Sequence, residues 1–147
     1  MFNNDELAIL WLDIFDFLTI NKKQDIIKLF ETPSEMYDNF ASQKQEILKH
    51  ISLNQYDKMM RMKNSQNIDK YIKYLEDSKI KFTTFCSDDY PEFLFDYNNN
   101  PLILYYKGDL NLLYTNCVGV VGTRKYTRYG ERVTENYCEK LALNGVT

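Results

Sequence analysis

The chain contains 147 residues, of which 44% are hydrophobic and 27% are charged, and its formal net charge at pH 7 is −3. This composition is typical of a soluble globular protein with one ordinary domain or two small ones. It lacks the basic balance of a typical nucleic-acid-binding domain, and no apolar run approaches the roughly 20 residues of a membrane span. No basic segment and no secretory cleavage site accompany the apolar residues near the start, so we expect a cytoplasmic protein that does not associate with membranes.

The first part of the chain is predicted to be helical. All five glycines lie in the last third, and residues 1–107 contain none; a glycine in a helix interior costs about 1 kcal/mol relative to alanine. From Leu7 to Leu18, apolar residues recur at three- and four-residue steps and predict one helix face, with Asn3 or Asn4 as the cap. Further helices are expected over residues 22–30, from Pro33 to Phe40, around 47–51, and over 54–75, the last as one long helix or as two that meet near Asn64-Ser65.

After Lys79 the pattern changes to that of short strands. Residues 80–85 and 102–106 are rich in β-prone side chains. Between them, a turn at Ser87–Pro91 is predicted to open a helix that Asp88 or Asp89 caps. Residues 117–121 are apolar apart from one glycine, as expected for a third strand that is buried in a parallel sheet.

A helix is predicted to follow this third strand, from Tyr129 or Gly130 to Leu143, and to end at Asn144-Gly145. Val146-Thr147 would then begin the next parallel strand. A strand, a glycine turn and a helix form two-thirds of a βαβ unit, which cannot bury both faces of its sheet alone. The expected fold class is therefore α + α/β. An all-helical N-terminal domain spans residues 1–78, and residues 79–147 form the truncated, incomplete start of a parallel-sheet domain.

The cysteines predict neither a disulfide framework nor a metal site. Cys86, Cys117 and Cys138 are odd in number and widely spaced, no CxxC pair occurs, and His50 is the only histidine. We therefore expect buried or half-buried reduced thiols and no metal.

The turn after the third expected strand carries the candidate site. A strand that ends in Gly122 and leads into a helix presents free backbone N–H groups at the helix N-terminus, where anions bind. Arg124 adds a planar, permanently charged fork that suits phosphate. Thr123 or Thr127 provides a hydroxyl for a hydrogen bond or for capping the helix. Residues 122–132 contain four basic side chains, Arg124, Lys125, Arg128 and Arg132, and one acidic side chain, Glu131. The local net charge is therefore +3.

Two interpretations stay open at this turn. The spacing of Gly119 and Gly122 gives neither GxGxxG nor the P-loop pattern, which disfavours dinucleotide binding and NTP hydrolysis, so no cofactor is expected. Phosphate binding and a purely structural strand–helix turn both fit what remains. Tyr126 and Tyr129 are likewise expected either to pack a helix against a sheet or to stack on bases.

Three motifs, taken in order, resemble those of the DprA/Smf family of DNA-processing proteins. Two of them are similar to the family's YP..L and P..LY.KG patterns: Asp89-Tyr90-Pro91 with Leu94, and Asn100-Pro101 with Leu104-Tyr105-Tyr106-Lys107-Gly108-Asp109. The third, Val120-Val121-Gly122-Thr123-Arg124-Lys125 with Thr127 and Tyr129-Gly130, resembles the VGTR…YG segment that opens the family's Rossmann-like core. The resemblance covers residues 79–147, whereas residues 1–78 match only as a helical domain of the expected size.

The resemblance implies a Rossmann-like second domain and a role without catalysis. Members of this family bind single-stranded DNA, form homodimers when full length, and load a RecA-type recombinase onto incoming strands in natural transformation. The DNA-phosphate contacts that it implies are Gly122, Thr123 and Arg124, and the auxiliary DNA contacts are Lys125, Thr127 and Arg128. Some members grip phosphate with a glycine hairpin in the N-terminal domain. We do not expect that grip here, because no glycine precedes Gly108.

Two other functions remain as alternatives. A Rossmann-like nucleotide phosphoribohydrolase of the lysine-decarboxylase-like family also opens with a strand, a glycine–serine–arginine turn and a helix. Such an enzyme would not normally carry the YP and LY.KG prefix or a helical domain ahead of it. The other alternative is a truncated fragment that no longer binds anything.

Overall fold

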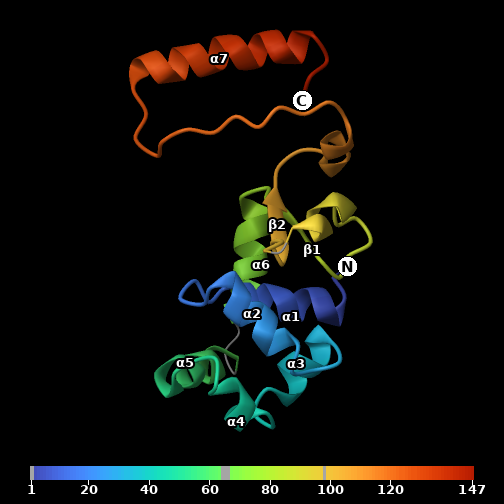
Figure 1. Cartoon of the computed structure of the whole chain (residues 1–147), viewed down its shortest axis with the longest axis vertical. Coiled ribbons are helices and arrows are strands. Elements are labelled where there is room, and N and C mark those ends of the chain that lie inside the picture. Colours follow the sequence, from blue (N-terminus) through green and yellow to red (C-terminus); the bar gives the residue numbers. More distant parts are fainter. Residues whose placement is uncertain (1, 64–66, 98) are drawn as a thin grey trace. The chain divides into compact units, whose positions relative to one another are not determined.

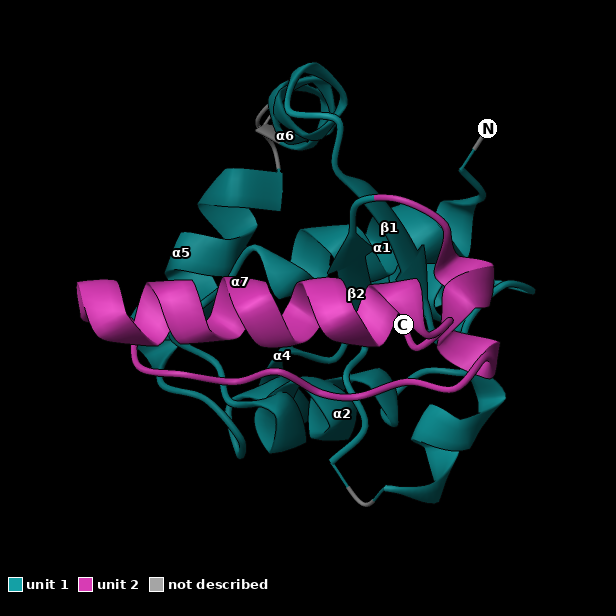
Figure 2. Cartoon of the chain, turned by 90° about the horizontal axis from the view of Figure 1, so that it is seen from above, with its two compact units in different colours: residues 1–107 teal, residues 108–147 magenta. Residues whose placement is uncertain are grey.

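The computed structural model describes residues 2–63, 67–97 and 99–147, and it divides into two compact units. Unit 1 comprises residues 1–107 and unit 2 comprises residues 108–147 (Figure 2). In the described parts of the chain, no helix combines the length and the apolar character that crossing a membrane requires.

Helices make up most of unit 1 (Figure 1). They are α1 (Asn4–Asp13), α2 (Ile20–Ile27), α3 (Pro33–Asn39), α4 (Lys44–Ile47), α5 (Leu53–Lys63) and α6 (Asn67–Asp77). The helices expected from the sequence are present, with shifted ends, and the last expected segment forms two helices. The predicted meeting point at Asn64-Ser65 lies outside the described residues.

Short polar side chains set where the helices of unit 1 begin. Asn3 and Glu6 form a capping box at α1: the Asn3 side chain accepts from the Glu6 amide at 2.9 Å, and the Glu6 carboxylate accepts from the Asn3 amide at 2.8 Å. Thr19 caps α2 and Thr32 caps α3, where Pro33 occupies the first turn. Each cap satisfies a backbone amide that the helix itself leaves without a partner.

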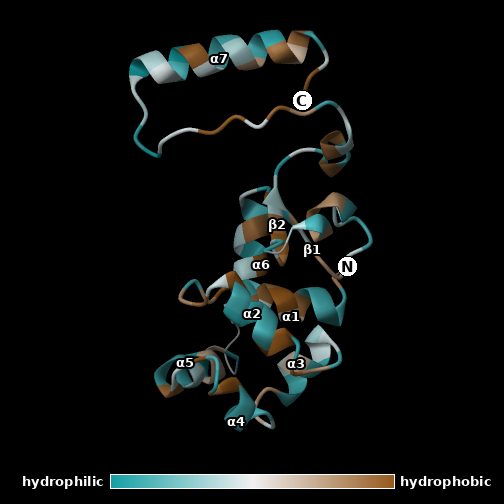
Figure 3. Ribbon diagram, viewed as in Figure 1, coloured by the Kyte–Doolittle hydropathy of each residue, from teal (hydrophilic) through white to brown (hydrophobic). Residues whose placement is uncertain are grey.

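The core of unit 1 is centred on α1, which carries five consecutive buried residues from Ala8 to Leu12. Figure 3 shows hydrophobic residues filling most of α1, whereas they alternate with hydrophilic residues along α7 (Arg128–Leu143). Trp11 is 1% exposed, and its ring meets those of Phe15, Tyr37 and Phe40 edge-on at centroid distances of 5.1 to 5.3 Å. Five consecutive buried residues cover every side of the second half of α1, and α3, α6 and both strands pack against this helix.

Two short strands complete unit 1. Strand β1 (Lys81–Thr84) pairs antiparallel with β2 (Ile103–Tyr106), and Lys81 lies opposite Tyr106. The 3-10 helix η1 (Glu92–Asp96) lies between them in the chain. The prediction that Asp88 or Asp89 caps this helix is wrong. Its cap is Pro91, and the Asp89 carboxylate instead accepts a hydrogen bond from the Thr83 hydroxyl at 2.6 Å.

A partly buried ion pair joins the helices of unit 1 to its strands. The Lys23 ammonium, on a residue only 6% exposed, donates to Asp13 Oδ1 at 2.8 Å and to the Asp13 carbonyl at 3.0 Å. The Tyr105 hydroxyl, on β2, donates to Asp13 Oδ2 at 2.9 Å. Burial raises the pKa of Tyr105 strongly, and the neighbouring Tyr71 and Asp13 raise it further, so the phenol keeps its proton and remains a donor.

The packing boundary of the structure lies at Lys107–Gly108, while the sequence analysis predicts a domain boundary at residues 78–79. Phe82, Leu102 and Ile103 belong to the same buried cluster as Trp11, so β1 and β2 pack with the helices. Gly108, the first glycine of the chain, adopts a φ of +103° where the chain leaves β2. The predicted domain division, which concerns evolutionary units as well as packing, stays a prediction.

Unit 2 contains a 3-10 helix, an extended segment and one long helix. The 3-10 helix is η2 (Leu110–Tyr114), and the extended segment, residues 115–127, leads into α7. The predicted buried strand at residues 117–121 is not formed: these residues make no ladder and are all exposed. A strand needs a neighbour along its length, and in this structure only the backbone of Thr147 lies against the segment's first residues.

The ends of α6 and α7 use the same hydrogen-bonded turn. After α7, the amides of Gly145 and Val146 donate to the carbonyls of Ala142 and Leu141. Gly145 has a φ of +72°, as the sequence predicts for the residue that ends this helix. After α6, Lys79 takes the corresponding position with a φ of 54°, so a residue with a side chain adopts the left-handed conformation that favours glycine.

Candidate functional site

The six predicted site residues lie together at the entry of α7 and all are exposed. Figure 1 shows the extended segment before this entry running alongside the helix. The residues are Gly122, Thr123, Arg124, Lys125, Thr127 and Arg128. All six therefore belong to one continuous, exposed turn.

Two threonines organise the turn. The Thr127 side chain accepts a hydrogen bond from the Gly130 amide at 3.1 Å and so caps α7, one of the two roles that the sequence suggested for it. The Thr123 hydroxyl donates to the Lys125 carbonyl at 2.7 Å and closes a tight bend. The Thr123 hydroxyl thus acts as a donor and the Thr127 hydroxyl as an acceptor in fixing the backbone of the turn.

The cations of the turn remain available. In unit 2, which the structure describes throughout, the side chains of Arg124, Lys125 and Arg128 form no ion pair or hydrogen bond. The amides of Arg128 and Tyr129, in the first turn of α7, likewise have no hydrogen-bond partner within the unit. An anion at this helix N-terminus would meet free N–H groups, the positive end of the helix dipole and three cations.

A cavity of about 630 Å³ opens between the extended segment and the first turns of α7. Its walls include four of the predicted residues, namely Gly122, Thr123, Lys125 and Thr127, but neither Arg124 nor Arg128. The helix side of the cavity, which was not predicted from the sequence, consists of Gly130, Glu131, Thr134 and Glu135. Their three- and four-residue spacing, read as one helix face, is the signal that would have found them.

The two glutamates limit where an anion can bind. Glu131 and Glu135 both line the cavity, and their carboxylates repel phosphate. A phosphate group is therefore expected at the turn 122–128, where the cations lie, and not deep along the flank of α7. The site accordingly has basic side chains at the turn 122–128 and acidic side chains, Glu131 and Glu135, along the first turns of α7.

The chain after α7 returns to the start of the extended segment. The Thr147 amide donates to the Asn116 carbonyl, and the Thr147 carbonyl accepts from the Val118 amide, both at 2.8 Å. Thr147 thus lies opposite Cys117 and forms hydrogen bonds with the residue before it and the residue after it, as in adjacent parallel strands. The turn 122–128 follows the carboxyl end of this segment.

The cysteines differ in their surroundings. Burial raises the pKa of the half-buried Cys86 thiol to about 11, and Asp5 and Glu6 raise it as well, so this thiol stays protonated. Cys117, expected to be buried or half-buried, is exposed, and its Sγ donates to the Leu112 carbonyl at 3.2 Å. Within the described residues, no group of three or more His, Cys, Asp and Glu side chains is suited to hold a metal ion.

Comparisons with known proteins agree with the motifs around this turn. A model of the DNA recombination-mediator protein A family matches residues 81–147, which include the turn and α7. The chain is 33% identical over 82 residues to protein Smf of Escherichia coli, a stretch that covers 56% of this chain and 22% of that protein. No solved structure matches the chain.

Two further relatives extend the similarity. Protein Smf of Borreliella burgdorferi is 25% identical over 140 residues, which cover 95% of this chain and 43% of the relative. Protein Smf of Synechocystis is 30% identical over 95 residues, which cover 62% of this chain and 24% of the relative. The chain therefore spans less than half the length of the curated relatives it matches.

Proposed function

Because the chain belongs to the DprA/Smf family of DNA recombination mediators, we propose that its turn 122–128 binds the phosphate backbone of single-stranded DNA. The observation that carries the proposal is the exposed entry of α7, where three cations and two helix amides have no partner within unit 2. Such a site binds phosphates by charge and by backbone geometry, without reading base edges.

Each predicted residue has a distinct task in this proposal. The Arg124 guanidinium forms paired hydrogen bonds with phosphate oxygens. A Cβ atom at Gly122 would meet no heavy atom within 4 Å, so packing does not require glycine at this position. In this proposal the missing side chain leaves the backbone accessible to a phosphate group. Thr123 and Thr127 hold the bend and the helix entry in place, and Lys125 and Arg128 add neighbouring charge.

Two tyrosines next to the turn suit unstacked bases. Tyr126 and Tyr129 are 68% and 69% exposed, so neither packs a helix against a sheet in this structure. Exposed aromatic rings beside a basic track are the usual platform on which single-stranded bases stack, and each stacked base contributes about 1–3 kcal/mol. We assign these two rings to that role.

The hydrogen bonds of Thr147 support the proposal of a Rossmann-like core. Segment 116–121, α7 and the residues around Thr147 would form its strand–helix–strand unit, with 116–118 and Thr147 already in a parallel pairing. The family resemblance adds four points to this proposal: homodimer formation, loading of a RecA-type recombinase, a role in natural transformation and a cytoplasmic location. The role is that of a mediator without catalysis.

One observation favours the alternative of a nucleotide phosphoribohydrolase. Glu131 and Glu135 line one cavity beside a phosphate-binding turn, and a carboxylate near a bound nucleotide is what hydrolysis of a glycosidic bond requires. Release of free base from a nucleoside monophosphate by the purified chain would support this enzyme. The family assignment favours DNA binding.

The test is the affinity of the chain for fluorescent oligo-dT, measured by anisotropy over a range of salt concentrations. Arg124→Ala is expected to weaken binding by about 1–3 kcal/mol and to lower the salt slope by about one phosphate contact. Lys140→Ala removes the same charge from the last turn of α7 and serves as the matched control. Unchanged affinity of the Arg124 variant would contradict the assignment of this side chain to DNA.

A further inference from the structure

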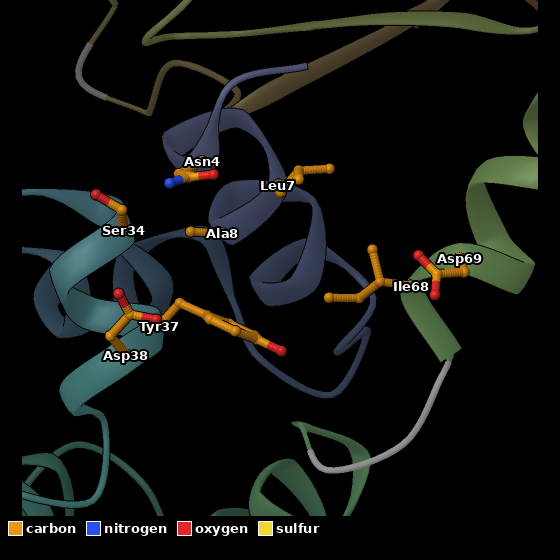
Figure 4. A pocket seen from close by; sticks show the side chains of 8 residues that line it. All are labelled: Asn4, Leu7, Ala8, Ser34, Tyr37, Asp38, Ile68 and Asp69. Carbon is orange, nitrogen blue, oxygen red and sulfur yellow. The ribbon is translucent and has the colours of Figure 1, made fainter. Parts of the chain in front are cut away.

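Unit 1 contains a cavity that the proposed DNA site does not involve. It has a volume of about 320 Å³ and lies between α1, α3 and α6 (Figure 4). Ligand pockets usually range from about 300 to 1,000 Å³, so this cavity suits a single side chain and not a nucleotide or a large cofactor. Its lining residues are Asn4, Leu7, Ala8, Ser34, Tyr37, Asp38, Ile68 and Asp69.

The lining combines an apolar floor with an acidic rim. Leu7 and Ala8 of α1 and Ile68 of α6 form the apolar part, and Ala8 is buried. Asp38 and Asp69 lie at the rim and are exposed. Figure 4 shows Tyr37 and Ile68 reaching into the space from opposite sides, with Asp38 next to Tyr37 and Asp69 next to Ile68. A ligand with an apolar stem and a cationic head matches this arrangement.

The carboxylates at the rim have no protein partner in the described parts of the chain. Neither Asp38 nor Asp69 takes part in an ion pair or a side-chain hydrogen bond there. Asp5, whose carboxylate accepts from the Ser34 amide at 2.8 Å, adds a third negative charge beside the cavity. Burial raises the pKa of Tyr37, and Asp38 and Asp69 raise it further, so both carboxylates act on this hydroxyl.

A lysine of the chain lies next to Tyr37 and Asp38 at one side of the rim. The Lys63 ammonium lies 4.8 Å from the centre of the Tyr37 ring and donates to the Asp38 carbonyl at 3.1 Å. It compensates part of the charge near Asp38 and does not pair with Asp69. Among the described residues, Asp69 on the other side of the cavity therefore has no ion-pair partner, and it lies beside the apolar Leu7, Ala8 and Ile68.

We propose that this cavity binds an arginine side chain of a partner protein, with its stem on Leu7, Ala8 and Ile68 and its guanidinium at Asp69. A guanidinium is more weakly hydrated than an ammonium and offers a planar fork to a carboxylate, which favours arginine over lysine. Asp38 contributes through its charge. The proposal does not depend on DNA binding by the turn 122–128, because the cavity lies wholly within unit 1.

The test is a nuclear magnetic resonance titration of the whole, isotope-labelled chain with the peptide acetyl-Gly-Gly-Arg-Gly-Gly-amide. Saturable shifts are expected at the amides of Ala8, Tyr37, Ile68 and Asp69. The same peptide with citrulline in place of arginine keeps the shape and loses the charge, and it should not bind. Absence of saturable shifts with the arginine peptide, or equal binding of both peptides, overturns the proposal.

Charge variants locate the binding. Asp38→Asn with Asp69→Asn is expected to weaken binding of the arginine peptide by about threefold to tenfold, the range for two exposed charge pairs. Asp16→Asn with Asp77→Asn removes the same total charge from exposed positions outside the cavity, and it should change the affinity by less than about twofold. Equal effects of the two double variants would show that net charge, and not this cavity, attracts the peptide.

Two further outcomes identify other occupants. Binding of agmatine, a free guanidinium compound, without binding of the peptide would make the ligand a small cation and overturn the proposal of a protein partner. Self-association of the chain that the Asp38→Asn and Asp69→Asn changes abolish would identify the occupant as a second copy, which also overturns it. Unchanged chemical-shift dispersion of both variants confirms that the comparison is between folded proteins.

Discussion

Units 1 and 2 differ in what holds their backbones in place. Residues 1–107 contain no glycine and include every buried residue of the described chain, whereas residues 108–147 contain all five glycines and no buried residue. Side-chain packing therefore specifies unit 1. In unit 2, local backbone interactions hold the chain in place: the Thr127 cap, the positive φ of Gly108 and Gly145, and the two backbone hydrogen bonds of Thr147.

The difference follows from where each unit places its apolar residues. In unit 1 they surround α1 and exclude water, which stabilises the folded state in proportion to the apolar area removed from solvent. In unit 2 Val118, Val120 and Val121 are 49%, 55% and 96% exposed. The apolar residues of unit 2 thus contribute little to its stability in this structure, and they lie on the segment that leads to the proposed DNA site.

The largest expected effect tests whether packing holds unit 1. Phe40 is fully buried between Trp11 and Tyr56, so Phe40→Ala should lower the free energy of unfolding by about 3–5 kcal/mol. Tyr137→Ala removes a ring that is 64% exposed on α7 and should leave the unfolding of unit 1 unchanged. Urea denaturation followed by circular dichroism measures both variants. A similar loss in the two would mean that the units do not differ as described.

A smaller effect is expected from the ion pair that joins the helices of unit 1 to its strands. Asp13→Ala removes the carboxylate that balances the charge of the buried Lys23 ammonium, and it should cost about 3 kcal/mol of stability. Adding Lys23→Met to this variant should restore part of the loss, because the unpaired charge is then gone. If Asp13→Ala alone melts at the temperature of the unchanged protein, the pair does not join these elements.

The smallest expected effect concerns the two matching helix ends. Lys79→Gly should raise the stability of unit 1 by about 0.5–1 kcal/mol, because glycine adopts a positive φ without the cost that a side chain imposes. Gly145→Ala should have the opposite sign and reduce the helix content of unit 2. Thermal melting and far-ultraviolet circular dichroism follow the two changes. A destabilised Lys79→Gly variant would show that the lysine side chain has a role of its own.

The sequence predicted the parts of the fold that depend on local chemistry. Periodic apolar residues located the helices of unit 1, and β-prone runs located β1 and β2. The strand at residues 117–121 was predicted wrongly, because a strand exists only when neighbours supply its hydrogen bonds, and composition does not report neighbours. Asp89 was misassigned for a related reason, since its carboxylate accepts a hydrogen bond from the Thr83 hydroxyl on the neighbouring strand β1.

The sequence predicted the residues of the candidate turn, which are contiguous in the chain, but not the residues of α7 that line the cavity beside it. A glycine, a cap and clustered cations are contiguous in sequence, so the turn 122–128 could be found by reading along the chain. The cavity wall formed by Glu131 and Glu135 comes from a helix face that turns back toward the segment. The acidic cavity of unit 1 is lined by residues of α1, α3 and α6, which are far apart in the sequence, so no contiguous motif indicates it.

Trp11 is the only tryptophan of the chain, and it lies at the centre of unit 1. Its fluorescence therefore reports on unit 1 alone and is silent about α7, whereas the far-ultraviolet signal of helices includes both units. A denaturation followed by the two optical signals at once separates the units without any label. Coincident curves would mean that the two units melt as one cooperative body, and a helical signal that falls before the tryptophan emission shifts would assign the first transition to α7.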